Sequence, residues 1–216
     1  MSLRIAASLA SAPMARLGQV IEELETAQVD IIHFDIEDGS FVPAMTLGTK
    51  IIADLRPLTR LPFDVHLMMV NPEWLLPDLV RFGAQRISVH YEACPYPRRV
   101  LRQIVSLGAQ AGIAFNPATV LPDLDYLLPY LSYIVILTSE PEIPDCPFLP
   151  EILEKVRQGK KISSLQGLQW VADGGIKPEN LGEVAQAGVD TVVVGRSLFA
   201  QDRINENVHR LRAAMP

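Results

Sequence analysis

The sequence predicts a (β/α)8 TIM barrel, because eight short apolar runs alternate with eight segments of helical periodicity along the 216 residues. Continuous apolar strands separated by helices are typical of a parallel sheet that is covered on both faces. Eight such units favour a closed barrel over an open sheet. The units average about 27 residues, which is compact for this fold. Residues 1–216 are therefore predicted to form a single domain.

Apolar and β-branched residues mark the predicted strands, which cover residues 3–9, 31–37, 63–68, 86–90, 111–115, 133–137, 169–172 and 191–194. A helix is predicted after each strand, at residues 13–27, 47–55, 73–82, 97–107, 121–130, 151–158, 178–188 and 202–213. Pro13 and Pro178 suit the first turn of a helix, whereas Gly83 and Gly108 end one. A proline-rich loop at 141–150 separates the sixth strand from the next helix.

Composition and charge narrow the class of protein. The net charge of −6 argues against a broad nucleic-acid-binding surface. Cys94 and Cys146 lie far apart and in no metal-ligand spacing, which indicates a reducing compartment and no disulfide framework. No apolar run reaches membrane-spanning length, and the N-terminus lacks the layout of a signal peptide. The sequence therefore predicts a cytoplasmic enzyme with no membrane partner.

Polar side chains collect where the predicted strands end, which is where a barrel of this type carries its active site. His33, Asp35 and Glu37 share one face of their strand, because side chains alternate along a strand. His66 lies in the C-terminal half of the third strand, and Asp173 follows the seventh directly. A mixed set of imidazoles and carboxylates (His33, Asp35, His66, Asp173) suits a divalent transition metal such as zinc, manganese, iron or cobalt.

Each of these residues also has an ordinary structural explanation. A single histidine at a strand end is more often a hydrogen-bonded structural residue, and we assign His90 to that class. Asp173 could form the turn of its Asp-Gly-Gly segment, and Ser8 could cap the first helical region. Glu37 is expected to face water or to contact the metal or the substrate, because an unpaired buried carboxylate is costly. The joint placement of the residues is what favours a metal site.

Two glycine-containing segments follow the last two strands, Gly174-Gly175 and Gly195-Arg196. In this fold, loops at these positions commonly bind a phosphate through backbone N–H groups. Glycine lets the backbone approach the phosphate closely, and Arg196 can add a charged donor. We therefore expect a phosphate site beside the metal site.

Several segments resemble those of one known family. The chain is similar to the ribulose-phosphate 3-epimerases over essentially its whole length, on seven ordered segments: 8–12 with 15–18, 33–43, 64–68, 90–93, 116–119, 173–176 and 195–199. The resemblance implies a barrel of the ribulose-phosphate-binding type that holds one divalent metal ion per chain, with zinc expected first and iron, manganese or cobalt as alternatives. It also implies a homo-oligomer, a dimer or a hexamer.

The resemblance assigns roles to particular residues. It implies that the metal ligands are His33, Asp35, His66 and Asp173, and that Asp35 and Asp173 are also the catalytic acid/base pair. It implies that the substrate is bound by Ser8, His66, Gly174, Gly175, Gly195 and Arg196. The implied reaction is a metal-dependent inversion at C3 of a ketose phosphate through an enediolate. Removing a proton from one face and returning one to the other requires two carboxyl groups, one ionised and one protonated.

The chain departs from the family pattern at some of these positions. The family usually has methionine where this chain has Glu37 and where it has Leu137, and serine where it has Arg196. The glycine-rich segment after the sixth strand is replaced by 140–146. These changes resemble a divergent epimerase-like subgroup, so the substrate could be ribulose 5-phosphate with xylulose 5-phosphate or a related pentulose or hexulose phosphate.

Two other functions are weighed against the epimerase. A decarboxylase or aldolase of the phosphate-binding barrels would typically present Asp-x-Lys-x-x-Asp on the third strand, but residues 64–68 contain no lysine. A barrel that binds a sugar phosphate without turnover is suggested by the altered segment at 140–146. The presence of all four expected metal ligands argues against it.

Overall fold

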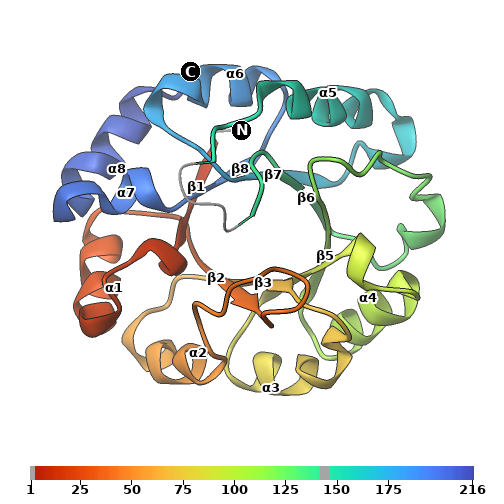
Figure 1. The fold of residues 1–216 in the computed structure, drawn as a ribbon, viewed down its shortest axis with the longest axis horizontal. Helices are drawn as coiled ribbons and strands as arrows, with labels where there is room; N and C mark the ends of the chain where they lie inside the picture. The colour runs from red at the N-terminus through yellow and green to blue at the C-terminus, as the bar shows by residue number, and fades with distance from the viewer. Residues whose placement is uncertain (1–2, 142–145) are drawn as a thin grey trace.

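The structure is a computed structural model that describes residues 3–141 and 146–216. Eight parallel strands pair in chain order and close into a barrel, because β1 pairs with both β2 and β8 (Figure 1). The strands are β1 (Arg4–Ser8), β2 (Ile31–Glu37), β3 (Phe63–Met68), β4 (Arg86–His90), β5 (Gln110–Phe115), β6 (Tyr133–Leu137), β7 (Gln169–Asp173) and β8 (Thr191–Val194). The predicted barrel and the order of its strands are confirmed.

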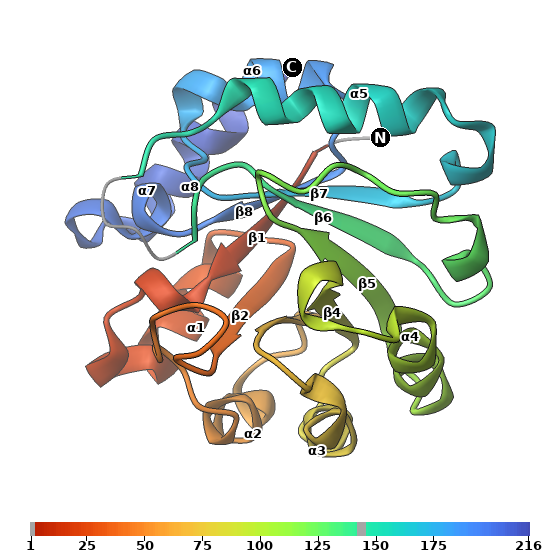
Figure 2. The same ribbon diagram turned by 45° about the vertical axis from the view of Figure 1, so that its right-hand side comes forward.

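Helices surround the barrel on the outside (Figure 1, Figure 2). They are α1 (Leu17–Thr26), α2 (Lys50–Leu55), α3 (Leu76–Arg81), α4 (Pro97–Ser106), α5 (Leu153–Lys161), α6 (Leu181–Gln186), α7 (Arg196–Phe199) and α8 (Ile204–Ala213). Several begin later than predicted, because a short 3-10 turn comes first. Such turns at Met14–Arg16, Pro72–Trp74 and Pro178–Asn180 precede α1, α3 and α6. The short helix α7, directly after β8, was not predicted.

The predicted helix at 121–130 is wrong, because the β5–β6 connection is a loop with only a 3-10 turn at Asp125–Leu127. The Asp123 carboxylate accepts the backbone N–H of Asp125 at 2.9 Å, a local contact that competes with helix formation. Pro129 has no N–H to donate to a helical hydrogen bond. Leu127 is buried and holds the turn against the barrel.

The core has two parts that differ in chemistry. Apolar side chains fill the space between the strands and the helices. Inside the barrel, small and branched residues pack around the fully buried Tyr133. A Cβ atom at Gly112 on β5 would lie 2.4 Å from the Tyr133 ring, so glycine makes room for this side chain. The barrel interior also contains the charged residues Asp64 and Arg86, which are buried below the mouth.

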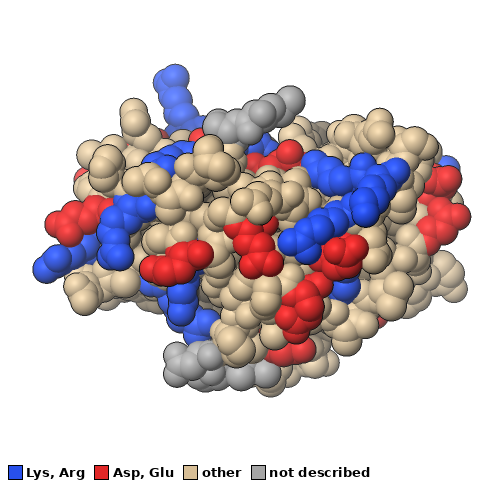
Figure 3. Space-filling view, turned by 90° about the horizontal axis from the view of Figure 1, so that it is seen from above, with Lys and Arg blue, Asp and Glu red and all other residues tan. Residues whose placement is uncertain are grey.

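The outer face over α5 and α6 carries Lys and Arg side chains mixed with Asp and Glu (Figure 3). Arg157 on α5 lies 3.6 Å from Glu183 on α6, so the charges partly pair across this face. Within the described part of the chain, no helix combines the length and the apolar character needed to cross a membrane.

Candidate functional site

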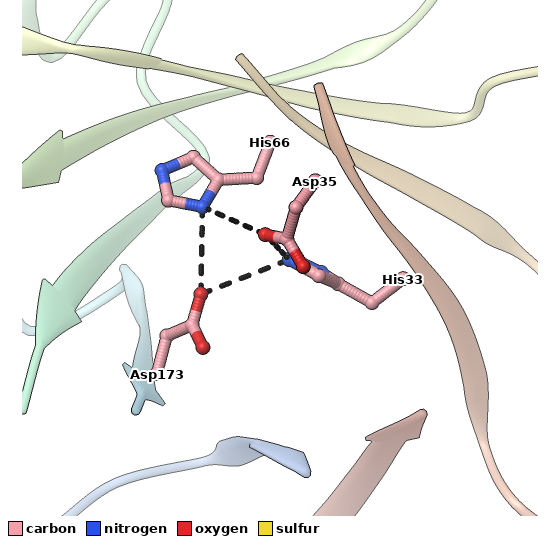
Figure 4. A group of neighbouring side chains, drawn as sticks. All are labelled: His33, Asp35, His66 and Asp173. Atoms are coloured by element: carbon pink, nitrogen blue, oxygen red, sulfur yellow. Dashed lines mark hydrogen bonds and ion pairs between the residues drawn. The ribbon is translucent and has the colours of Figure 1, made fainter. Parts of the chain in front are cut away.

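Four of the predicted residues meet at the mouth of the barrel (Figure 4). The register of β2 and β3 sets Asp35 opposite His66, and Asp173 is the last residue of β7. His33 Nε2 lies 3.1 Å from Asp35 Oδ1 and 3.7 Å from Asp173 Oδ2. His66 Nδ1 lies 3.5 Å and 3.4 Å from the same two oxygens. One ligand atom from each of the four residues lies within 4.8 Å of all the others.

This group can bind a divalent metal ion. It offers two imidazole nitrogens and two carboxylate oxygens, a set that suits transition metals. Both histidines are fully buried, and Asp35 is nearly so. The Nδ1 atom of His66 is buried and has no hydrogen-bond partner among the described residues, although it faces the centre of the group. A buried nitrogen of this kind is well suited to hold a cation.

The imidazoles and carboxylates of the group shift one another's pKa values. Burial by itself would lower the pKa of His66, but Asp173 and Asp35 raise that pKa to about 9. Burial also opposes the raised pKa of His33, which its carboxylate neighbours lift well above the ordinary value. Burial by itself would raise the pKa of Asp35, but the two imidazoles hold it well below its usual range. Protons and a metal ion would therefore compete for the same four side chains.

His66 is joined to a second histidine on its other side. His66 Nε2 lies 2.9 Å from His90 Nε2, and His90 Nδ1 lies 3.2 Å from Glu92 Oε2. Burial lowers the pKa of His90 to about 4, and the charge of His66 adds to this effect. Glu92 is anchored by the backbone N–H of Asn116 at 2.8 Å and by the Thr119 hydroxyl. Both ring nitrogens of His90 thus have a partner, as the sequence position of a hydrogen-bonded histidine suggested.

His33 also has a buried partner, which the sequence reasoning missed. Asp64 Oδ2 lies 3.2 Å from His33 Nδ1, and Asp64 Oδ1 accepts the Tyr133 hydroxyl at 2.9 Å. Arg86 Nε lies 3.5 Å from the same oxygen, and its guanidinium covers the Tyr133 ring at 4.1 Å. Asp64 precedes His66 by two residues on β3, so strand alternation could have identified it as another inward-facing residue.

Glu37 differs from its expectation. The residue is only 5% exposed, so its carboxylate does not face water. Its Oε2 atom accepts the backbone N–H of Thr46 at 2.7 Å, which offsets part of the cost of burial. Its Oε1 atom has no hydrogen-bond partner among the described residues. Glu37 lies outside the group of four ligand atoms and does not line the cavity described next.

A cavity of about 700 Å³ lies above the four-residue group and reaches Asp35 and Asp173. Its wall includes the other residues that the sequence predicted for substrate binding, apart from His66: Ser8, Gly174, Gly175, Gly195 and Arg196. The Ser8 hydroxyl donates a hydrogen bond to Asp35 Oδ2 at 2.7 Å. Lys177 and Asn180 also line the cavity and were not predicted, although they follow the Gly174-Gly175 segment directly.

The glycines of this wall allow other segments to approach closely. Gly175 has a φ of +69°, and a Cβ atom there would lie 2.9 Å from Phe148 Cα. A Cβ atom at Gly195 would lie 2.5 Å from the Ser11 hydroxyl. Any larger residue at either position would therefore shift the cavity wall. Gly175 and Gly195 themselves line the cavity.

Solved structures share this fold at low sequence identity. KGPDC from Streptococcus mutans has a TM-score of 0.71 and 12% identity, with 99% of this chain and 97% of that chain covered. Orotidine 5'-phosphate decarboxylase from Pyrococcus horikoshii OT3 has a TM-score of 0.67 and 16% identity, with 97% and 98% covered. At this identity the likeness concerns the fold alone.

Sequence comparison gives a much closer match. The model of the Ribulose-phosphate 3 epimerase family matches residues 4–199. The ribulose-phosphate 3-epimerase of Synechocystis sp. is 40% identical over 212 residues, covering 96% of this chain and 92% of that protein. The enzyme of the same name from Escherichia coli K12 is 35% identical over 214 residues, covering 98% and 95%. The chain therefore belongs to the ribulose-phosphate 3-epimerase family and is an isomerase.

Proposed function

We propose that this isomerase inverts C3 of a ketose phosphate, with the interconversion of ribulose 5-phosphate and xylulose 5-phosphate as the first candidate reaction. The observation that carries the proposal is the pair of carboxylates, Asp35 on β2 and Asp173 on β7, at the floor of the cavity. Epimerisation beside a ketone needs a carboxylate to remove a proton from one face of the carbon and a carboxylic acid to return one to the other face.

Asp35 and Asp173 are assigned these two acid/base roles. They come from strands that are well separated around the barrel, so a substrate in the cavity could be reached from two sides. The Ser8 hydroxyl donates to Asp35 and would hold this carboxylate in one orientation. Asp35 is buried and Asp173 is only partly exposed at the cavity, which would limit the access of water to the proton transfers.

The four-residue group is proposed to hold the metal ion, through His33 Nε2, His66 Nδ1 and one oxygen each of Asp35 and Asp173. Zinc is the first candidate because it favours mixed nitrogen and oxygen ligands, with iron, manganese and cobalt as alternatives. A bound divalent ion would act as a Lewis acid and stabilise the negative charge of the enediolate. His66 lies outside the cavity wall, so we assign it to the metal and not to direct substrate contact.

The phosphate is proposed to bind at the part of the cavity wall that is formed by the segments after β7 and β8. Gly174, Gly175 and Gly195 would offer backbone N–H groups, and Arg196 would offer a guanidinium. Lys177 adds a second cation to the same wall. Binding energy from the phosphate would position the reacting carbon between the two carboxylates.

Four broader proposals accompany this function. The single barrel that the described residues form supports one domain for residues 1–216. The family relationship supports a homo-oligomer, a dimer or a hexamer, and a cytoplasmic location. The net charge of −6 and the mixed charges of the face in Figure 3 support a small sugar phosphate, and not a nucleic acid, as the partner.

The proposal is tested by metal analysis of the purified protein, together with solvent deuterium exchange into a panel of ketose 5- and 6-phosphates. We expect about one metal ion per chain and exchange at C3 of one sugar, with conversion to its epimer. Asp54→Asn, at an exposed carboxylate of α2, is the matched control and should exchange like the wild type. A metal-loaded protein that exchanges no sugar of the panel would instead support a binding role.

A further inference from the structure

We propose that Asp64 and the His90–Glu92 pair are positioning residues that fix opposite tautomers of the two histidines at the candidate metal centre. In this arrangement His33 presents the lone pair of Nε2 and His66 presents the lone pair of Nδ1. The inference rests on the metal site proposed above. It adds three residues that touch neither the metal position nor the cavity but decide which nitrogen can bind.

Glu92 fixes the proton positions of His90 and His66. A carboxylate can only accept hydrogen bonds, so the contact of 3.2 Å between Glu92 Oε2 and His90 Nδ1 requires a proton on His90 Nδ1. In a neutral His90, Nε2 is then an acceptor. The 2.9 Å contact with His66 Nε2 consequently requires a proton on that atom. In the neutral ring that binds a metal ion, His66 Nδ1 then carries the lone pair, and this is the atom that faces Asp35 and Asp173.

Packing holds this chain of contacts in place. The rings of His66 and His90 are stacked with 4.9 Å between their centroids, and the Phe41 ring lies 4.7 Å from that of His90. Glu92 cannot easily turn away, since its other oxygen accepts the backbone N–H of Asn116 at 2.8 Å. A histidine ring enclosed on several sides has little freedom to flip, so the proton order is set by Glu92.

His33 is fixed in the opposite tautomer, with its proton on Nδ1, by Asp64. Asp64 Oδ1 accepts the Tyr133 hydroxyl, and Asp64 Oδ2 faces His33 Nδ1 at 3.2 Å. Since the carboxylate has no proton to give, His33 Nδ1 must be the donor. In a neutral ring, which is the form that binds a metal ion, Nε2 then carries the lone pair, and it faces the centre of the group, 3.1 Å from Asp35 Oδ1 and 3.7 Å from Asp173 Oδ2. Without the ion, a second proton on Nε2 would donate to Asp35. Arg86, which is 4% exposed, supplies the positive charge that balances a fully buried Asp64.

The two imidazoles need different partners because they face the candidate metal position through different nitrogens. His33 comes from β2 and His66 from β3, and the two rings meet the same centre through different nitrogens. An imidazole in the wrong tautomer would direct an N–H group at the cation and could not bind it. A purely structural role for Asp64, His90 and Glu92 would require their burial and pairing but no particular proton order.

Side-chain 15N NMR of the zinc-loaded protein reports the proton position directly. The chain has four histidines, and the exposed His209 on α8 serves as an internal reference. We expect a proton on Nδ1 of His33, on Nε2 of His66 and on Nδ1 of His90. The wild-type spectrum tests the Asp64 contact without a variant, which is useful because Asp64→Asn leaves the buried Arg86 uncompensated.

Zinc affinity, measured by chelator competition, tests the His90 contact with a matched pair of variants. His90→Phe keeps a ring but removes the acceptor for His66 Nε2–H, and we expect zinc affinity to fall by about 10- to 100-fold. His90→Gln offers a carbonyl oxygen in place of the imidazole nitrogen and should restore most of the affinity. The thermal stability of both variants is measured as well. A difference in zinc affinity between variants of similar stability cannot come from a general loss of packing.

The outcomes separate this inference from the function on which it rests. A wild-type protein that binds no zinc or other divalent metal would overturn the metal centre itself. A protein that binds zinc with a proton on His66 Nδ1 or on His33 Nε2 would overturn the tautomer assignment alone. The same holds if His90→Phe and His90→Gln bind zinc with equal affinity.

Discussion

Ser8 Oγ lies 2.7 Å from Asp35 Oδ2 and donates a hydrogen bond to it. Ser8 is the last residue of β1 and is paired in register with His33 of β2, so the hydroxyl reaches Asp35 across two neighbouring strands. The other oxygen of Asp35 faces the two histidines. One carboxylate therefore has one oxygen directed to the candidate metal position and the other held at the cavity wall.

Ser8→Ala is expected to lower kcat by about 10- to 100-fold, because a hydrogen bond to a charged group contributes about 1.5–3 kcal/mol. Metal content should not change, since the oxygen that faces the histidines is untouched. Steady-state kinetics and metal analysis of the same preparation check both statements. Ser11→Ala removes a hydroxyl from the same cavity but not from Asp35, and it should have a much smaller effect on kcat. Loss of metal from Ser8→Ala would contradict this account.

Asp173→Asn is expected to reduce turnover by about 100- to 10,000-fold, the usual contribution of a general acid or base. The amide has nearly the same shape but can neither take nor give the proton at C3. Deuterium incorporation from solvent is the direct measurement, with Asp54→Asn as the control on an exposed helix. Wild-type exchange in Asp173→Asn would remove this residue from the acid/base pair.

Much of this site could be predicted from the sequence alone. The inward position of His33, Asp35 and His66 follows from strand alternation. His33 and Asp35 are two residues apart on β2 and so face the same side, and His66 lies opposite Asp35 on β3. Asp173 follows from the convergence of all strand ends in a closed barrel. These residues need no information beyond the fold class and the positions of the strands.

Other features depend on tertiary contacts and could not be predicted. The leucines at 121–130 have helical spacing, yet the turn formed at Asp123 and the burial of Leu127 give a loop. Asp64 and Arg86 stand in apolar strands, and nothing local indicates that they neutralise each other inside the barrel. A buried Glu37 looked costly from the sequence. The contact that offsets part of this cost, the Thr46 N–H donated to Glu37, joins the strand to the following loop and could not be read from the sequence.

Arg196→Ala is expected to raise the KM for the sugar phosphate by about 10-fold with little change in kcat, because it removes uniform phosphate binding. The effect should shrink at high salt, since Arg196 is exposed and its attraction to an anion is screened. Arg210→Ala, at an exposed arginine of α8, controls for the loss of one positive charge. An unchanged KM in Arg196→Ala would show that the glycine backbone and Lys177 bind the phosphate without it.

The lowered pKa of Glu92 leads us to expect a specific pH dependence of stability in the metal-free protein. Partial burial would raise its pKa, but hydrogen bonds from His90, Thr119 and the Asn116 N–H lower it to about 2, against 4.5 for an ordinary Glu. A depressed pKa in the folded state stabilises the protein above pH 4.5, and this contribution is lost as the pH falls toward 2. Its size should be about 1 kcal/mol, because the side chain is partly solvated.

The measurement is urea unfolding of wild type and Glu92→Gln between pH 7 and pH 3, with the metal removed by a chelator. The difference in unfolding free energy should be constant at neutral pH and should narrow below pH 4.5. Glu154→Gln, at an exposed carboxylate of α5, should show no such narrowing. A difference that grows on acidification would have the wrong sign for a carboxylate with a lowered pKa.

Substitutions of Glu37 can show whether this residue has a structural role or a role in substrate recognition. Its Oε2 atom accepts the Thr46 N–H, and its Oε1 atom is buried without a hydrogen-bond partner among the described residues. Glu37→Gln keeps an acceptor for Thr46 and removes a buried charge, so its unfolding free energy should equal or exceed that of the wild type. Glu37→Met leaves the Thr46 N–H unpaired and should lose about 1 kcal/mol. Because Glu37 does not line the cavity, neither change should alter the KM by more than about 3-fold. A larger rise of the KM in Glu37→Met alone would mean that this carboxylate contacts the sugar.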